Sequence, residues 1–278
     1  MVSRRKPEWL KVKLPQNNLA AVSKYRLHTI CTSGLCPNRS ECWGCGTATF
    51  MIGGDICTRA CKFCNVKTGR PTPLDPDEPE NIAVSVNSLR LKHAVITSVD
   101  RDDLPDLGAL HWVAVIKAVK AKNPTTTMEV LIPDFQGRKE LIYLILDAHP
   151  EVVSHNLETV RRLSKSVRSR ATYDVSLAVI RQIADYGIVA KSGIMLGLGE
   201  TRDEIIETMH DLREAGCSVM TIGQYLQPSK ANIEVSEYVR PEIFSEYQRI
   251  GKEKGFAHVE SGPLVRSSYH AERHVTIN

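Results

Sequence analysis

The chain has 278 residues, of which 42% are hydrophobic, so it is long enough for one large core or two modest domains. Its formal net charge is only +4, and this near balance does not indicate a nucleic-acid partner. The sequence has no run of about 18 apolar residues, which argues against a membrane-spanning helix and a membrane partner.

The first predicted segment, residues 1–46, is irregular and rich in Pro, Gly, Asn and Cys. We interpret it as an N-terminal extension that is ordered by metal. Its start, Met1 to Leu14, is basic but lacks the apolar core of a secretory signal, and it is too short and too poor in Ser for a transit peptide. We therefore expect a cytoplasmic protein, in which thiols stay reduced.

Between residues 47 and 255, apolar runs of strand length alternate with longer amphipathic stretches. Six consecutive βα units favour parallel strands joined by right-handed crossovers, so we predict an α/β fold, a partial (β/α)6 barrel. A C-terminal extension, 256–278, begins with a strand-like run at 257–260. The predicted strands of the barrel are 47–52, 93–98, 127–132, 151–156, 189–196 and 218–223, and the predicted helices are 80–92, 107–122, 138–148, 174–186, 202–215 and 241–254.

Cysteine spacing is the most informative feature of the sequence. Seven of the eight cysteines lie between Cys31 and Cys64, and only Cys217 falls elsewhere, at the start of an apolar strand where we predict a core thiol. A disulfide scaffold would be shorter and would spread its cysteines along the chain. The crowding therefore indicates a metal site.

The second group of cysteines, Cys57, Cys61 and Cys64, has the spacing C-x3-C-x2-C and directly follows the first barrel strand. Ligands bind at the carboxyl ends of strands in such folds. Three thiolates can hold three irons of a cubane cluster and leave the fourth iron open. The alternative is a zinc loop that pairs Cys61–Cys64 with Cys42–Cys45, but tetrahedral zinc explains neither the C-x3-C spacing nor the barrel.

This motif, with Phe63 just before its last cysteine, resembles the signature of the radical S-adenosylmethionine (radical SAM) superfamily. The resemblance implies a 4Fe-4S cluster whose open iron chelates the amino and carboxylate groups of the methionine moiety. An electron from that cluster then breaks a carbon–sulfur bond and gives a 5′-deoxyadenosyl radical. Cys57, Cys61 and Cys64 are thus predicted to be metal ligands and catalytic residues.

The first group of cysteines has the spacing Cys31-x4-Cys36-x5-Cys42 and resembles that of lipoyl synthases. The segments Gly46-Thr47-Ala48-Thr49-Phe50-Met51 and Arg266-Ser267-Ser268-Tyr269 match the same family, and the resemblance runs from about residue 27 to residue 271. It implies a second, auxiliary 4Fe-4S cluster with a serine as fourth ligand, which is sacrificed as the sulfur donor.

Spacing does not decide which serine binds this cluster. We favour Ser268 as the metal ligand and catalytic residue, with Ser267 as the alternative. A hard alkoxide suits a cluster that must be taken apart, because it matches iron–sulfur centres less well than thiolate does. Cys45 departs from the family pattern and is either a structural thiol or an alternative ligand beside Cys42.

Polar residues near the carboxyl ends of later strands are predicted to bind S-adenosylmethionine. They lie in the segments T-S-V-x-R-D-D and H-N-L-E-T, which match the family, and in the strand 189–196, where a buried lysine and serine need partners. A carboxylate of the cofactor would suit the lysine. Asp100, Asp102 and Asp103 could equally cap the next helix. The predicted cofactor contacts are Phe63, Thr97, Ser98, Asn156, Glu158, Lys191 and Ser192.

The resemblance implies a sulfurtransferase that inserts two sulfur atoms at C6 and C8 of a protein-bound octanoyl group, using S-adenosylmethionine. The implied partners are lipoyl carrier domains, such as acyltransferase subunits of dehydrogenase complexes or the glycine-cleavage H protein, and an electron donor such as ferredoxin or flavodoxin. The basic stretch 161–170 is either a solvated helix face or a docking site for an acidic carrier. A biotin synthase-like enzyme would not need the first cysteine group, and a zinc protein or electron carrier would need no barrel.

Overall fold

The computed structural model describes residues 6–11, 28–30, 36, 38, 42 and 47–275. Most of the predicted N-terminal extension, including Cys31 and Cys45, lies outside the described residues. Within them, an eight-stranded sheet has the order β1-β2-β5-β6-β7-β8-β9-β10. Every pair from β2 to β10 is parallel, and β1 pairs with β2 antiparallel.

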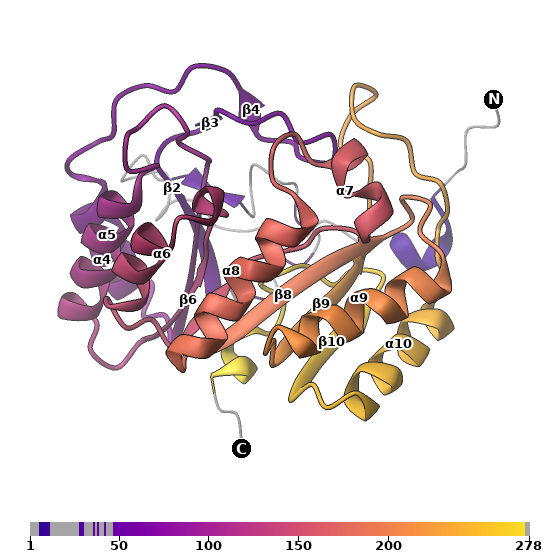
Figure 1. The fold of residues 1–278 in the computed structure, drawn as a ribbon. Coiled ribbons are helices and arrows are strands. Elements are labelled where there is room, and N and C mark those ends of the chain that lie inside the picture. The colour runs from indigo at the N-terminus through magenta and orange to yellow at the C-terminus, as the bar shows by residue number, and fades with distance from the viewer. Residues whose placement is uncertain are drawn as a thin grey trace.

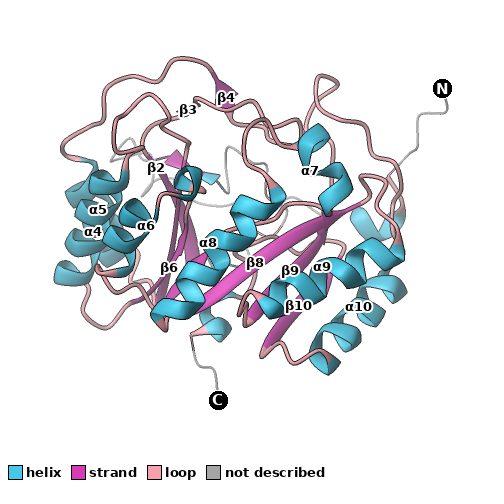
Figure 2. Ribbon diagram, in the orientation of Figure 1, coloured by secondary structure: helices cyan, strands magenta, loops and turns pink. Residues whose placement is uncertain are grey.

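The strands and helices confirm the predicted α/β fold. Helices lie along the outer face of the curved sheet (Figures 1 and 2). The parallel strands are β2 (Thr47–Ile52), β5 (His93–Ser98), β6 (Thr127–Leu131), β7 (Val152–Ser154), β8 (Val189–Leu196), β9 (Val219–Gln224) and β10 (His258–Gly262), with β1 at His28–Thr29. The helices are α4 (Glu78–Ser88), α5 (Ala109–Lys122), α6 (Lys139–Leu146), α7 (Arg161–Val167), α8 (Tyr173–Tyr186), α9 (Arg202–Glu214) and α10 (Pro241–Glu253), with short turns η1 (Glu8–Leu10), η2 (Phe135–Gly137) and η3 (Ala271–His274).

Helix ends follow the capping residues that the sequence supplies. Helix α8 begins after Thr172, whose hydroxyl accepts a hydrogen bond from the Val175 N–H, and ends at Gly187, which adopts a φ of 89°. Helix α9 begins with a capping box formed by Thr201 and Glu204. Helix α4 begins at Glu78, two residues before its predicted start, because a proline is tolerated in the first helical turn.

The two faces of the sheet differ in chemistry. Successive side chains on a strand point to opposite faces. One set, which includes Phe50, Ile96 and Ile194, joins the hydrophobic core between the sheet and the helices. The alternate side chains of the sheet, which include Glu129 on β6 and Lys191 on β8, lie inside the barrel, and many of them are polar. The barrel interior is therefore where buried chemistry occurs.

Several boundaries differ by a few residues from the predicted ones, and two elements, β10 and α7, differ more. Strand β10 pairs with β9 in parallel, so the sheet continues to Gly262 and past the predicted barrel end at residue 255. Helix α7 covers residues 161–167 of the basic stretch, where a helix face was one of the two interpretations, although no barrel helix was predicted there. Both elements are short, and short elements carry little periodicity for a sequence pattern to detect.

Candidate functional site

The loop that contains Cys57, Cys61 and Cys64 lies at the carboxyl end of the barrel. Two short parallel strands, β3 (Ile56–Cys57) and β4 (Lys67–Thr68), pair and bring the two ends of this cysteine loop together. A hydrogen bond from the Gly69 N–H to the Cys57 carbonyl, 3.0 Å long, closes it further. Figure 1 shows both strands at the upper end of the barrel. The predicted position at the carboxyl ends of the strands is confirmed.

Backbone N–H groups point at two of the loop's thiols. Cys57 Sγ accepts from the N–H groups of Arg59 at 3.4 Å and Asp100 at 3.3 Å, and Cys64 Sγ accepts from the Val66 N–H at 3.4 Å. Burial raises the pKa of Cys57 to about 12, with a further contribution from Asp100, and burial raises the pKa of Cys64 to about 11. A half-buried thiol of this kind loses its proton readily when a metal ion binds the sulfur and displaces it, and N–H···S bonds tune iron–sulfur clusters. The loop fits a cluster.

Arg59 anchors the cysteine loop to the barrel, which the sequence analysis missed. Its buried guanidinium binds both oxygens of Asp102 at 2.8 Å, and Asp134 at 2.8 Å. Asp100 lies 3.3 Å away. The hydrogen bond from Arg59 lowers the pKa of Asp102 to about 2, so this carboxylate stays ionised.

Asp102 and Asp103, which follow β5, do not cap the next helix, α5. Asp102 binds Arg59, and Asp103 binds Arg101 at 2.9 Å. The backbone N–H groups at the start of α5 are bound instead by the carboxylate of Asp106. The aspartates of the T-S-V-D-R-D-D segment therefore fix the loops at the carboxyl end of the barrel.

A second loop, residues 226–236, packs against the cysteine loop from the other side. The Asn232 side chain donates to the carbonyls of Lys62 at 3.2 Å and Cys64 at 2.9 Å. Phe63 packs into a small apolar cluster with Val167, Leu198 and Tyr225. The aromatic residue before the last cysteine thus helps to seat the loop, and a contact of Phe63 with a cofactor stays a prediction.

Thr97 and Ser98 end β5 beside the cysteine loop. The Thr97 hydroxyl donates to the Leu131 carbonyl at 3.2 Å, and its side chain is nearly buried. The strand register places Ser98 opposite Ile52, where β2 ends. Both residues thus lie at the expected edge of the sheet.

Asn156 and Glu158 follow β7 at the same edge. Asn156 exchanges hydrogen bonds with Ser267 over 3.3–3.4 Å, and it also binds the Glu158 carboxylate. Burial raises the pKa of Glu158, and the nearby Arg168 guanidinium opposes this shift. Glu158 adopts a φ of 67°, a strained backbone geometry for a non-glycine residue, and such strain is concentrated at functional sites.

Two predicted cofactor contacts need correction. Lys191 donates to both carboxylate oxygens of Glu129, at 2.8 and 2.7 Å, and both side chains are fully buried. Its carboxylate partner is therefore a protein residue rather than a cofactor. Ser192 follows Lys191 on β8 and points to the opposite, helix-covered face, where its hydroxyl accepts from the Leu157 N–H at 3.2 Å.

Part of the N-terminal extension and the segment that follows β10 meet at the carboxyl end of the barrel. The Asn38 side chain donates to the Leu264 carbonyl at 2.6 Å, and the Cys42 N–H donates to the Asn38 carbonyl at 3.0 Å. Burial lowers the pKa of Arg266, and the nearby Cys36 thiol raises it. The R-S-S segment (Arg266–Ser268) therefore lies beside the first cysteine group, of which Cys36 and Cys42 are described.

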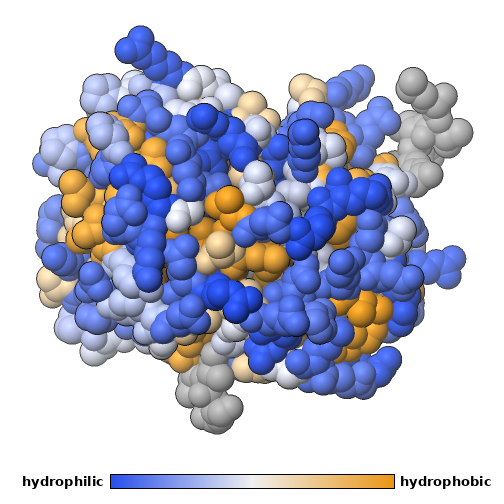
Figure 3. All heavy atoms as spheres, in the orientation of Figure 1, coloured by the Kyte–Doolittle hydropathy of each residue, from blue (hydrophilic) through white to orange (hydrophobic). Residues whose placement is uncertain are grey.

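The basic stretch 161–170 is largely paired within the chain. Figure 3 shows hydrophilic side chains over much of the face that includes α7, with smaller apolar patches between them. No described helix has the length and apolar composition needed to cross a membrane. The pairs are Arg161 with Asp174 and Asp211, Arg162 with Glu204, and Arg170 with Asp102, while Arg168 is buried and binds Ser176.

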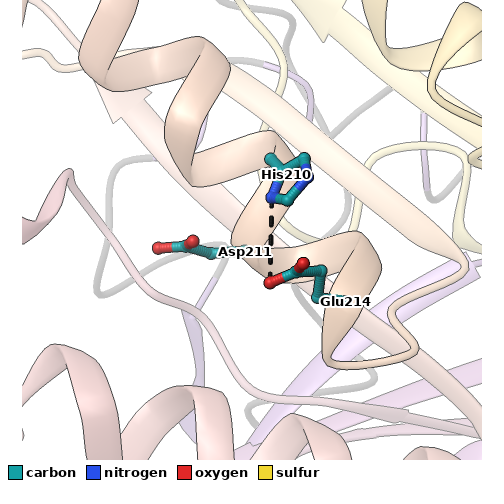
Figure 4. Close-up of side chains that lie close together, drawn as sticks. All are labelled: His210, Asp211 and Glu214. Carbon is teal, nitrogen blue, oxygen red and sulfur yellow. Dashed lines mark ion pairs between the residues drawn. The ribbon is translucent and has the colours of Figure 1, made fainter.

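A second group of potential ligands lies on α9, away from the cysteine loop. The ligand atoms of His210, Asp211 and Glu214 lie within 4.8 Å of one another, and His210 pairs with Glu214 at 3.7 Å (Figure 4). Asp211 already accepts a hydrogen bond from the Tyr173 hydroxyl at 2.9 Å. Because His210 and Glu214 are mostly exposed, this group is a surface ion pair along one helix face.

Comparison with known proteins identifies the family. The Radical SAM superfamily profile matches residues 51–212. A lipoyl synthase of Treponema denticola is 69% identical over 98% of this chain and 96% of its own length, and one of Parabacteroides distasonis is 63% identical over 98% of both chains. The coproporphyrinogen III oxidase HemN of Escherichia coli, a radical SAM enzyme, shares the fold with a TM-score of 0.56 at 12% identity, over 82% of this chain and 58% of that one. The fold, the cysteine loop at its carboxyl end and these relatives agree, and the chain belongs to the lipoyl synthase family of the radical SAM superfamily.

Proposed function

We propose that this chain inserts two sulfur atoms into a protein-bound octanoyl group, at C6 and C8, and so forms the lipoyl cofactor. The observation that supports this most strongly is the meeting of three segments at one end of the barrel. The cysteine loop lies there, Asn38 of the first cysteine group binds Leu264, and Ser267 binds Asn156. An unactivated C–H bond offers side chains nothing to attack, so the chemistry must come from cofactors.

Cys57, Cys61 and Cys64 would hold the first 4Fe-4S cluster. When bound, that cluster and S-adenosylmethionine supply the radical that removes hydrogen from the octanoyl chain. The protein's own contribution is to hold the thiols in place: the Arg59–Asp102 ion pair fixes the loop, and N–H groups stabilise the sulfurs. Loop residues 226–236 cover one side and help to exclude water.

S-adenosylmethionine would lie against the carboxyl ends of β5 and β7. Glu158 is suited to the methionine ammonium, because its carboxylate is held by Asn156 and its strained backbone fixes its direction. Thr97 and Ser98 would provide short hydrogen-bonding groups beside it, and Phe63 would border the nucleoside.

The auxiliary cluster would be held by Cys31, Cys36, Cys42 and one serine. Ser267 already shares hydrogen bonds with Asn156, which favours Ser268 as the ligand. Arg266 lies close to Cys36 and would stabilise the negative charge of thiolates around the cluster. Such clusters need free thiols, so we propose a reducing compartment such as the cytoplasm.

The proposed substrates are octanoylated lipoyl carrier domains, of dehydrogenase-complex acyltransferases or the glycine-cleavage H protein. The proposed electron donor is a small protein such as ferredoxin or flavodoxin. Among the basic residues at 161–170, Lys165 is exposed and is suited to steering an acidic partner.

The direct test is an anaerobic incubation of reconstituted protein with an octanoyl-lysine peptide, S-adenosylmethionine and dithionite. We expect the peptide to gain two sulfur atoms by mass spectrometry, with release of 5′-deoxyadenosine. Cys36→Ala is the matched control, and it should release 5′-deoxyadenosine without thiolating the peptide. A wild-type protein that cleaves S-adenosylmethionine but leaves the peptide unchanged would refute the proposed reaction.

A further inference from the structure

A buried charge cluster lies inside the barrel, at the amino ends of the strands and away from the cysteine loop. Its centre is the ion pair between Lys191 on β8 and Glu129 on β6, with both side chains fully buried. Glu158, at the carboxyl end of the barrel, pairs with Ile194 on β8. Lys191 lies three residues before Ile194, which is roughly 10 Å nearer to the amino end of the strand. The pair is therefore too deep to take part in the chemistry at the carboxyl end.

The C-terminal turn η3 supplies the third member of this cluster. His274 is fully buried, and its Nδ1 lies 3.2 Å from Lys191 Nζ. The ammonium group donates, so this imidazole nitrogen accepts and the ring is neutral. Burial, with the Lys191 charge, lowers the pKa of His274 to about 2, in agreement with a neutral ring. The buried lysine thus binds the last described turn of the chain.

A second contact fixes the same turn. The Glu272 carboxylate accepts a hydrogen bond from the Thr47 hydroxyl at 3.2 Å, at the start of β2. Just before the turn, His270 adopts a φ of 51°, which redirects the backbone. Figure 1 shows this turn, in yellow, at the lower end of the barrel, opposite β3 and β4. Residues 263–274 therefore connect the two ends of the barrel.

The segment between these anchors contains both candidate serine ligands. Residues 263–270 form turns and no regular helix or strand, so no ladder of backbone hydrogen bonds fixes them. Apart from the contacts of Leu264 with Asn38 and of Ser267 with Asn156, their position depends on β10 before them and on η3 after them. We propose that Glu272 and His274 are positioning residues: their contacts with Thr47 and Lys191 fix the C-terminal segment, and thereby place Ser268 beside the first cysteine group. This inference rests on the proposed function, in which Ser268 is a cluster ligand.

The first test measures the anchoring itself, in protein without iron. His274→Ala and Glu272→Ala are compared with His274→Gln and Glu272→Gln, whose amide oxygens still accept hydrogen bonds. We expect hydrogen–deuterium exchange of residues 263–275 to become about tenfold faster in the alanine variants. Each alanine removes the group that accepts a hydrogen bond from buried Thr47 or Lys191. The glutamine variants should restore slow exchange. His210→Ala, an exposed histidine on α9, is the matched control.

The second test measures the iron content after reconstitution. The iron content of His274→Ala should fall from about eight to about four irons per chain, and this variant should still release 5′-deoxyadenosine. The iron content of His274→Gln should stay close to that of the wild type. Unchanged exchange and iron would overturn the proposal. Equal loss of both clusters would also overturn it, because the residue would then merely stabilise the barrel. If Ser268→Ala and Ser267→Ala both keep all their iron, the serine ligand of the proposed function fails, whereas the exchange result still decides the anchoring.

Discussion

The two cysteine groups differ in how the chain supports them. The loop of Cys57, Cys61 and Cys64 is built on the barrel, with strands β3 and β4 at its base and Arg59 bound to aspartates from two other loops. The described interactions of the first group instead join the N-terminal extension to the segment after β10: Asn38 binds Leu264, and Cys36 interacts electrostatically with Arg266. A site built on the barrel is preorganised, whereas a site between two such segments depends on both segments being held.

This difference suits the two chemical roles that we propose for the clusters. A cluster that generates a radical in every cycle needs rigid ligands and a fixed distance to its cofactor. In the proposed function the other cluster gives up its sulfur, so it must be taken apart and rebuilt. We therefore expect substitutions at the first group to impair only sulfur insertion, and substitutions around the second to impair every step.

The largest expected effect tests directly whether the two cysteine groups act in separate steps. Cys64→Ala should abolish the release of 5′-deoxyadenosine, because the first cluster loses one of three ligands, whereas Cys36→Ala should retain that release and lose thiolation. Both products are measured by mass spectrometry in the same incubation. Cys217→Ala, which removes a buried thiol outside both groups, is the control and should retain both products. Loss of 5′-deoxyadenosine in Cys36→Ala would mean that the two sites are not separable.

The next effect concerns the anchor of the cysteine loop. Arg59→Ala should lower the free energy of unfolding by about 3–5 kcal/mol, because it leaves Asp134 buried without its cation and leaves Asp102 with only the exposed Arg170. Arg59→Lys should cost less, since it keeps the charge but loses the paired geometry. Urea unfolding of the iron-free protein measures both. Arg249→Ala removes an exposed ion pair and serves as the control. Equal, small losses for Arg59→Ala and Arg249→Ala would show that the anchor is unimportant.

The third prediction concerns how stability depends on pH, through a histidine in the polar interior of the barrel, where the C-terminal turn η3 is also held. Burial, with the Lys191 charge, lowers the pKa of His93 to about 4, from an ordinary value near 6.5. Between these values the unfolded chain binds a proton that the folded chain does not, so stability should fall as the pH drops through this window. The slope from His93 is about 1.4 kcal/mol per pH unit. His93→Gln should flatten the dependence. An unchanged slope in His93→Gln would contradict the neutral, buried ring.

The smallest effect is expected at Cys217, which lies outside both groups. Cys217 is fully buried and belongs to the core between sheet and helices. Cys217→Ala should lower the free energy of unfolding by roughly 1 kcal/mol, the scale of a small cavity. Iron content should not change. A loss of iron in this variant would assign Cys217 to a metal site and would weaken the division into two groups of three.

The fold was predictable because its signals are local. Strands 47–52, 93–98 and 189–196 are found at their predicted bounds, since an apolar run and its flanking turn residues mark both ends. The position of the cysteine loop followed from its place after the first strand. Such patterns require only neighbouring residues.

The partners of buried charges were not predictable, because they are distant in sequence. Arg59 binds Asp134, 75 positions away, and Lys191 binds Glu129, 62 positions away. Sequence shows that a buried lysine needs a partner but does not show which residue is brought next to it. For this reason the cofactor was a reasonable but wrong partner for Lys191. The short strands β3 and β4, which close the cysteine loop, have two residues each and leave no readable pattern.

The central claim is that two separate clusters are held by different parts of the chain. Iron analysis with Mössbauer spectroscopy of reconstituted protein tests it most directly. The wild type should contain about eight irons per chain. Two variants, one with Cys31, Cys36 and Cys42 replaced by alanine and one with Cys57, Cys61 and Cys64 replaced, should each keep about four. A wild-type protein with a single cluster, or thiolation that survives replacement of Cys31, Cys36 and Cys42, would contradict the account.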